Sequence, residues 1–192
     1  MCLRFGPQSQ CAPTTGRALV RRCHIWYVGC PETGPDKTHT MSKTVIALAA
    51  DHAGFPLKEI MAEEVRALGY EALDLGTHDT ASVDYPDFGH AAAEAVLDGR
   101  AEKAVICCGT GLGISMAANK YPGIRAALCH DATTARLSRE HNDANILALG
   151  ARVTGTEVAR DAVRAFLATP FGGARHAPRV AKIDQIRTRE AV

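Results

Sequence analysis

A glycine-rich segment that follows an apolar run carries the residues best placed for chemistry. The run 103–108 ends in two cysteines, after which Gly109, Gly111 and Gly113 alternate with other residues. A buried strand, a tight turn and a helix start would bring together a thiol, several backbone N–H groups and the positive end of a helix dipole. Such surroundings suit an anion and favour the thiolate of Cys108 over the thiol. A base next to an oxyanion site is what proton transfer beside a carbonyl requires.

Cys108 is the residue we expect to act as this base. Successive side chains of a strand point to opposite faces, so Cys107 and Cys108 cannot share one role. Cys108 directly precedes the glycine turn, and no Asp or Glu occurs from Gly109 through His130. The alternative is that Cys108 is the last core residue of a strand and that the glycines serve only a turn. The glycines match a dinucleotide fingerprint only weakly, because their loop follows the third apolar run rather than the first.

Other polar residues could join a site for a phosphate or a sugar, and each also has a structural interpretation. Asp51 and His52 follow the first apolar run, where Asp51 could cap a helix or His52 could bind a phosphate or a sugar hydroxyl. His141 could end a helix as a solvated imidazolium or could transfer protons near neutral pH. Three arginines could be surface charges or could converge into a phosphate clamp. They are Arg152, Arg175 and Arg179.

Composition and charge exclude several classes of protein. The chain has 192 residues and an apolar fraction of 46%, enough for one domain with a core and a tail. Residues 1–41 hold five Lys/Arg and two Asp/Glu, a net charge of +3, whereas the remainder holds 17 and 19, a net charge of −2. A body of negative charge gives no reason to expect nucleic-acid binding. No stretch reaches the about 18 uninterrupted apolar residues of a membrane span, so we expect no membrane partner.

Cysteine usage favours a reducing compartment. Four of the seven cysteines lie in the first 41 residues, and the other three lie in strand-like runs. Buried free thiols in the cytoplasm are a simpler interpretation than a disulfide scaffold. No CxxC pair or tight Cys/His cluster occurs, so we expect neither a metal site nor a redox cofactor.

The first forty residues look unrelated to the rest of the chain. Residues 1–40 mix Cys, Arg, Pro, Gly and Thr without helical or strand periodicity, and Met41 leads directly into an apolar run. We expect 1–40 to be a disordered leader or an over-extended start, and 41–192 to be the functional domain. A targeting peptide is the alternative, because no acidic residue precedes Glu32. The apolar run 25–28 is too short for a signal-peptide core.

From residue 44 onward, short apolar runs alternate with longer amphipathic segments. Strands are predicted at 44–50, 71–75, 103–108, 124–129 and 145–149. Helices are predicted at 57–68, 86–98, 112–120, 132–141 and 156–168. This alternation predicts an α/β fold, a three-layer αβα sandwich around a five-stranded parallel, Rossmann-like sheet. Ligands of such sheets bind beyond the carboxyl ends of the strands.

The end of the chain, from Gly172 to Val192, differs from this pattern. Spacings of three or four residues would place Arg175, Arg179 and Lys182 on one helical face. We therefore expect a C-terminal helical tail, with Pro178 in its first turn.

Several separated motifs occur in one order between residues 43 and 187. Together they resemble the sugar-phosphate isomerase family that contains type B ribose-5-phosphate isomerases and the galactose-6-phosphate isomerase subunits. Agreement of separated motifs in order is more specific than any one motif. The motifs are Asp51-His52-Ala53-Gly54, Asp84-Tyr85-Pro86, Cys108-Gly109-Thr110-Gly111-Leu112-Gly113-Ile114-Ser115, Ala117-Ala118-Asn119-Lys120, His141-Asn142-Asp143 and Gly173-Ala174-Arg175-His176.

The resemblance implies an isomerase of the pentose phosphate pathway that interconverts ribose 5-phosphate and ribulose 5-phosphate through an enediolate, without a cofactor. It implies that Cys108 is the base and that His141 opens the furanose ring, assisted by Thr110. The loop backbone would hold the enediolate oxygen, Tyr85 would lie against the substrate, and arginines would bind the phosphate. The implied substrate-binding residues are Asp51, His52, Tyr85, Gly109, Thr110, Gly111, Leu112, Gly113, Asn142, Arg152, Arg175 and Arg179.

The resemblance also implies a homodimer whose active sites are shared between two subunits. Some relatives have Ser at the position of Cys108 and use a Glu further along, so this chain looks like the cysteine type. An isomerase for a six-carbon substrate, allose or galactose 6-phosphate, is the nearest alternative. A non-catalytic nucleotide-binding module on the same sheet is an alternative of another class.

Overall fold

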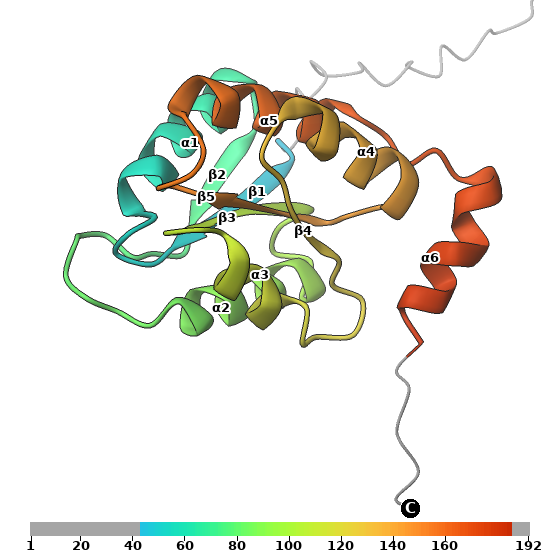
Figure 1. Ribbon diagram of the computed structural model, residues 1–192, viewed down its shortest axis with the longest axis horizontal. Helices are drawn as coiled ribbons and strands as arrows, with labels where there is room; N and C mark the ends of the chain where they lie inside the picture. The colour runs from blue at the N-terminus through green and yellow to red at the C-terminus, as the bar shows by residue number, and fades with distance from the viewer. Residues whose placement is uncertain (1–42, 186–192) are drawn as a thin grey trace, which may run out of the picture. The chain divides into compact units, whose positions relative to one another are not determined.

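The computed structural model of the protein describes residues 43–185 and contains the predicted alternation of strands and helices (Figure 1). The strands are β1 (Val45–Ala50), β2 (Glu71–Asp74), β3 (Lys103–Cys108), β4 (Ala126–Leu128) and β5 (Ile146–Gly150). The helices are α1 (Phe55–Ala67), α2 (Tyr85–Leu97), α3 (Leu112–Ala118), α4 (Ala132–Asn142), α5 (Thr156–Ala168) and α6 (Ala177–Ile183), with a 3-10 helix η1 (Ala174–His176). The expectation for residues 1–40 lies outside the described residues. None of the described helices is long and apolar enough to cross a membrane.

The strands form one parallel sheet in the order β2-β1-β3-β5-β4. Its central strands β1, β3 and β5 are buried almost throughout, as expected where helices cover both faces. The chain moves outward from β1 to β2 on one side and continues from β3 on the other, so β1 and β3 flank the point where a ligand crevice forms. In this register Ala50 lies beside Cys107, and Cys108 lies beside Gly150.

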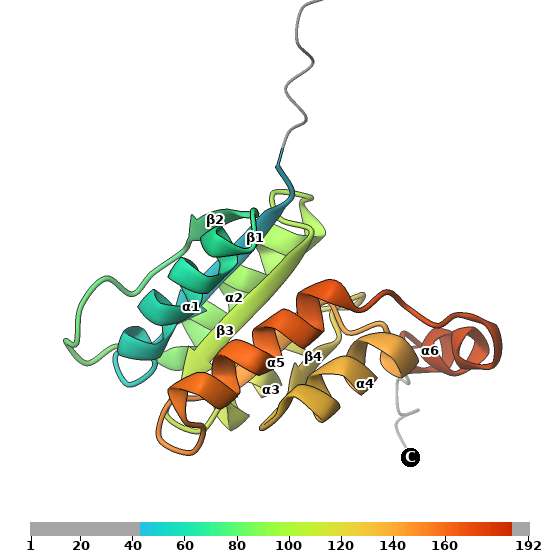
Figure 2. The same cartoon turned by 90° about the horizontal axis from the view of Figure 1, so that it is seen from above.

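Helices cover both faces of the sheet and complete three layers. Helices α1, α4 and α5 lie over one face, and α2 and α3 lie over the other (Figures 1 and 2). The first face packs a core that includes Met61 and Phe166, whereas the second packs the alanines of α2 together with Ile114. Cys107 belongs to the first core and Cys108 to the second, because neighbouring strand residues alternate between faces. The predicted three-layer α/β fold is confirmed.

Two predicted elements around the fourth strand end earlier than their sequence patterns indicate. The apolar run 124–129 contributes only its middle to β4, and the preceding helix ends at Ala118. A turn separates them, in which Gly123 has φ +85° and the N–H of Ile124 donates to the Tyr121 carbonyl at 3.1 Å. Backbone groups that would pair in a longer strand are therefore bonded within this turn.

The C-terminal tail forms η1 and α6, with Pro178 in the first turn of α6 as predicted. In both views α6 lies beside α4 rather than over the sheet (Figures 1 and 2). Its buried residue is Val180. At its far end, Arg125 donates to the Asp184 carboxylate at 3.2 Å.

Candidate active site

A cavity of about 360 Å³ opens beyond the carboxyl ends of β1 and β3. Its wall consists of residues that follow β1 and β5, the end of β3 with the turn into α3, and the first residue of α2. All of them except Ala53, which occurs only within one of the family motifs, are site residues predicted from the sequence. They are Asp51, His52, Ala53, Tyr85, Cys108, Gly109, Thr110, Gly113 and Arg152.

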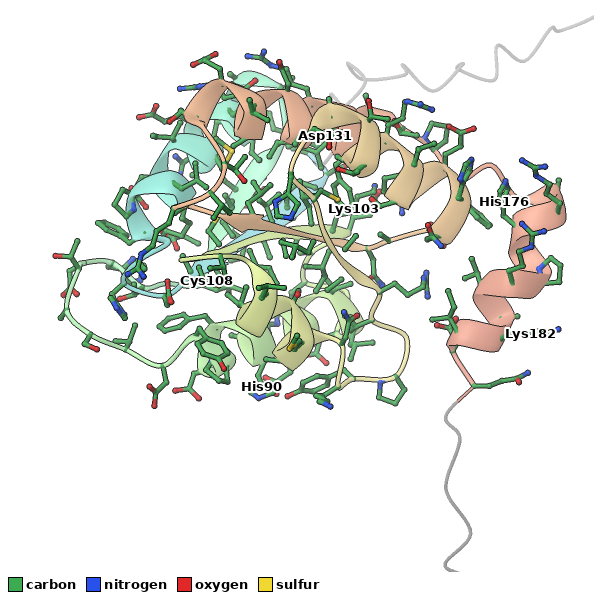
Figure 3. All side chains as sticks on the ribbon, viewed as in Figure 1. His90, Lys103, Cys108, Asp131, His176 and Lys182 are labelled. Atoms are coloured by element: carbon green, nitrogen blue, oxygen red, sulfur yellow. The ribbon has the colours of Figure 1, made fainter. Side chains whose placement is uncertain are left out.

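Cys108, at the end of β3, lines this cavity, and Figure 3 labels its place in the fold. The residue is only 4% exposed, so its thiol is reached through the cavity. The Gly111 N–H donates to Sγ at 3.0 Å. A hydrogen bond donated to sulfur stabilises negative charge on it, which is what a thiolate base needs.

The neighbouring Cys107 has the opposite environment. Its side chain is fully buried in the core under α1 and α5. Burial raises the pKa of the Cys107 thiol far above its usual value, and the nearby Cys108 and Asp51 raise it further. Cys107 is therefore an inert core residue, and of this adjacent pair only Cys108 faces the cavity.

The turn from β3 into α3 requires glycine at two positions. Gly111 has φ +78°, and a Cβ there would lie 2.4 Å from Cδ1 of Leu128. At Gly113 a Cβ would lie 2.6 Å from the ring of Tyr85, so the missing side chain leaves space for that ring at the cavity wall. The Leu112 N–H donates to Oγ1 of Thr110 at 3.4 Å. Gly109 and Gly113, which carry no side chain, therefore line the cavity together with Cys108.

Asp51 and His52 follow β1 on the other side of the cavity. The Asp51 carboxylate is buried and accepts a hydrogen bond from the Gly54 N–H at 2.7 Å, so it holds the turn that leads into α1. Nδ1 of His52 lies 3.2 Å from both the N–H and the carbonyl of Val83. The Val83 backbone can thus pair with Nδ1 in either tautomer, which leaves Nε2 of His52 to donate or accept.

Arg152 supplies the positive charge of this cavity. Its backbone N–H donates to the Gly109 carbonyl at 2.9 Å, which fixes the turn after β5 against the loop after β3. Its Nε would lie 3.4 Å from a Cβ built at Gly109, so the guanidinium passes directly over the glycine. A guanidinium at a cavity mouth can bind a phosphate with two parallel hydrogen bonds.

Gly111 and Leu112 lie at the start of α3 but do not line the cavity, and the other candidate residues lie elsewhere on the chain. His141, at the end of α4, stacks on His176 with ring centroids 4.3 Å apart, close to Arg175 of η1. Asn142 lines a larger cavity of about 590 Å³ between α4, α6 and the turn before β4. Figure 3 shows Cys108 and His176 well apart. Within 43–185 of one chain, the cavity at Cys108 is therefore not lined by His141, Asn142, Arg175 or Arg179.

Sequence reasoning missed Lys58, a buried cation that ties α1 to the end of β2. Its side chain is fully buried, and Nζ donates to the Asp74 carboxylate at 2.6 and 2.8 Å and to the Thr77 carbonyl at 2.8 Å. The signal was available, because Lys58 shares its helix face with Met61 and Val65 at spacings of three and seven. Among residues 43–185, no three His, Cys, Asp or Glu side chains are grouped so that they could hold a metal ion.

Comparison with known proteins identifies the family of the chain. The family model described as Ribose/Galactose Isomerase matches residues 46–183. The chain belongs to the Ribose/Galactose Isomerase family. Ribose-5-phosphate isomerase B of Escherichia coli (strain K12) is 44% identical over 144 residues, which cover 75% of this chain and 97% of that protein. Galactose-6-phosphate isomerase subunit LacB of Clostridium acetobutylicum is 40% identical over 143 residues, covering 74% and 83%.

A solved structure within the Ribose/Galactose Isomerase family superimposes on the fold. Ribose-5-phosphate isomerase B of Clostridium thermocellum is 55% identical, with a TM-score of 0.72 over 73% of this chain and 95% of that one. The matched family region begins with β1 and ends with α6, so it contains both the cavity and the histidine stack. The chain is therefore a sugar phosphate isomerase by family, and its substrate is a small sugar phosphate.

Proposed function

We propose that residues 41–192 interconvert ribose 5-phosphate and ribulose 5-phosphate. The Cys108 thiolate takes the proton from C2 of the open-chain aldose, and the electrons of that C–H bond form an enediolate. The same proton returns to C1, while the hydroxyl proton of O2 passes to O1 and O2 becomes the new carbonyl oxygen, so no net proton is consumed. The observation that carries this proposal is the Cys108 sulfur, which faces a cavity and accepts a hydrogen bond from the loop.

The surroundings of the sulfur support each part of this reaction. The enediolate is a weakly stabilised anion, and amide donors aimed at such an oxygen are worth about 10²–10³ in rate. In the glycine-rich segment Gly109–Gly113, the Gly111 N–H contacts the sulfur, and Gly109, Thr110 and Gly113 line the cavity. Asp51 and His52 are placed to bind sugar hydroxyls or phosphate, and Arg152 to bind the phosphate.

The site we propose is completed by a second copy of the chain. His141 would open the furanose ring, Asn142 would bind the sugar, and Arg175 and Arg179 would bind the phosphate from the partner. The support is their absence from the cavity of their own chain over residues 43–185, although the chemistry of ring opening and phosphate binding calls for them. A homodimer with two shared sites satisfies this requirement with one sequence.

Two further observations bear on where and on what the enzyme acts. The three described cysteines are free thiols, which supports the reducing cytoplasm as its location. A six-carbon substrate such as galactose or allose 6-phosphate is the second candidate, because a galactose-6-phosphate isomerase subunit is 40% identical.

A direct assay tests the proposal. The purified protein is given ribose 5-phosphate, allose 6-phosphate and galactose 6-phosphate, and the ketose formed from each is measured. We expect the highest kcat/KM for ribose 5-phosphate. A higher value for a six-carbon sugar would assign the enzyme to the second candidate, and no isomerisation of any sugar would overturn the proposal.

A further inference from the structure

The segment before α6 is folded back so that His176 reaches the end of α4. The Gly172 N–H donates to the Glu140 carbonyl at 2.9 Å, which ties the segment to α4. Gly173 and Ala174 then have φ of +56° and +44°, and the His176 N–H donates to the Gly173 carbonyl at 2.8 Å. A left-handed alanine is strained, and the bend that contains it brings His176 into contact with the end of α4.

His176 makes that contact with His141. The two imidazole rings lie 4.3 Å apart at an interplanar angle of 9°, a face-to-face stack (Figure 3 labels His176). Planar contact of this kind fixes the ring of His141 about its side-chain torsions. The Glu140 carboxylate lies 3.7 Å from Nε2 of His141 and pairs with Arg136 at 2.6 Å.

His176 also makes a hydrogen bond with Arg175. The Arg175 Nε–H donates to Nε2 of His176 at 3.3 Å, so this nitrogen must carry no proton. Burial lowers the pKa of His176, and the nearby His141, Arg175 and Arg179 lower it further against the opposing effect of Glu140. A neutral His176 keeps its acceptor available for Arg175 near neutral pH.

We propose that His176 is a positioning residue that links two functions of the proposed site. Its ring face orients His141 for ring opening, and its ring nitrogen orients the Arg175 guanidinium for the substrate phosphate. This inference rests on the proposed function. It assigns to His176 a role that requires both an aromatic face and an acceptor nitrogen, which no other natural side chain combines in this shape.

Two substitutions separate the two contacts. His176→Phe keeps an aromatic face against His141 but removes the acceptor for Arg175. His176→Gln keeps an acceptor for Arg175 but removes the stack. Both side chains fit a partly exposed position, so thermal unfolding is expected to show folded protein in each case.

Loss of each contact is expected to change a different kinetic constant. We expect His176→Phe to raise KM for ribose 5-phosphate and the inhibition constant of inorganic phosphate by about two- to tenfold, the value of one net hydrogen bond. We expect His176→Gln to lower kcat for ribose 5-phosphate by about two- to tenfold, the value of an aromatic pair. Ribulose 5-phosphate cannot close a furanose ring, because its O5 is phosphorylated. Exchange of its C1 protons with D₂O needs no ring opening and should therefore be unchanged in His176→Gln.

Other patterns overturn the inference. If both variants change kcat and KM alike, or if both match the wild type, His176 does not link the two functions. A wild-type protein without isomerase activity would instead overturn the proposed function, and phosphate inhibition or binding would then still report on the contact with Arg175.

Discussion

Replacement of Gly111 by alanine tests how closely the loop geometry and the reactivity of Cys108 are connected. The new Cβ would lie 2.4 Å from Cδ1 of Leu128 and 3.0 Å from the carbonyl carbon of Leu149. The leucine tip can shift, but the backbone of β5 cannot, so the loop itself must move. Gly111 also has φ +78°, and its N–H is the donor to the Cys108 sulfur.

The magnitude follows from these two costs and a matched control. A left-handed alanine costs about 1–2 kcal/mol, and overpacking adds about 1–3 kcal/mol. Gly69→Ala isolates the first cost, because Gly69 has φ +90° and nothing within 4 Å of a Cβ. We therefore expect Gly69→Ala to lower the free energy of unfolding by about 1–2 kcal/mol and Gly111→Ala by about 2–5 kcal/mol.

Activity distinguishes the two variants more sharply than stability. A hydrogen bond to a charged group is worth about 1.5–3 kcal/mol, so a displaced N–H at position 111 should lower kcat by about ten- to a hundredfold. Gly69→Ala should keep wild-type kcat. Urea unfolding and initial rates at a temperature where both variants are folded measure this. Equal stability and equal kcat in the two variants would refute the connection between the loop and the sulfur.

Three further predictions concern other parts of the molecule. Glu64→Gln should lower the free energy of unfolding at pH 7 by about 1–2 kcal/mol, because the buried carboxylate binds Arg164 at 2.6 Å and Arg160 at 2.7 Å. Arg164 and then Arg160 lower the pKa of Glu64 against the effect of burial. Urea titrations should therefore show the full difference in unfolding free energy between wild type and variant above the unfolded pKa of about 4.3, and the difference should be lost as pH falls through the folded pKa. His141→Ala should slow ribose 5-phosphate isomerisation more than C1 proton exchange of ribulose 5-phosphate, and an equal loss would remove its ring-opening role. Arg152→Ala should raise KM and the inhibition constant of phosphate by about tenfold with a smaller change in kcat, and an unchanged KM would place the phosphate elsewhere.

Hydrophobic patterning was sufficient to predict the layers of the fold. Apolar runs such as 103–108 can be buried only as strands covered on both faces, and the alternating segments cover them. The pattern could not predict the strand order, because β4 and β5 carry similar apolar residues and either could lie next to β3. It also extended the fourth strand to 124–129, since the turn at Gly123 depends on backbone conformation rather than on hydrophobicity.

The part of the candidate site that follows the strands was predictable from the fold. Residues that follow strands in a parallel sheet meet at one edge, so Asp51, Cys108 and Arg152 could be placed together from the sequence. Lys58 was not found, because a buried lysine is unexpected unless its partner Asp74 is known to lie beside it. The contact of His176 with His141 depends on a backbone bend that no periodicity reports.

The removal of the Cys108 sulfur tests the central claim most directly. In Cys108→Ala, exchange of the C1 protons of ribulose 5-phosphate with D₂O should fall by at least about 10², the usual contribution of a general base, while inorganic phosphate still binds. Cys107→Ala is the matched control, because that thiol lies in the core on the other face of the strand. It should exchange at the wild-type rate when folded. Exchange that persists in Cys108→Ala would contradict the account, because another group would then be moving the proton.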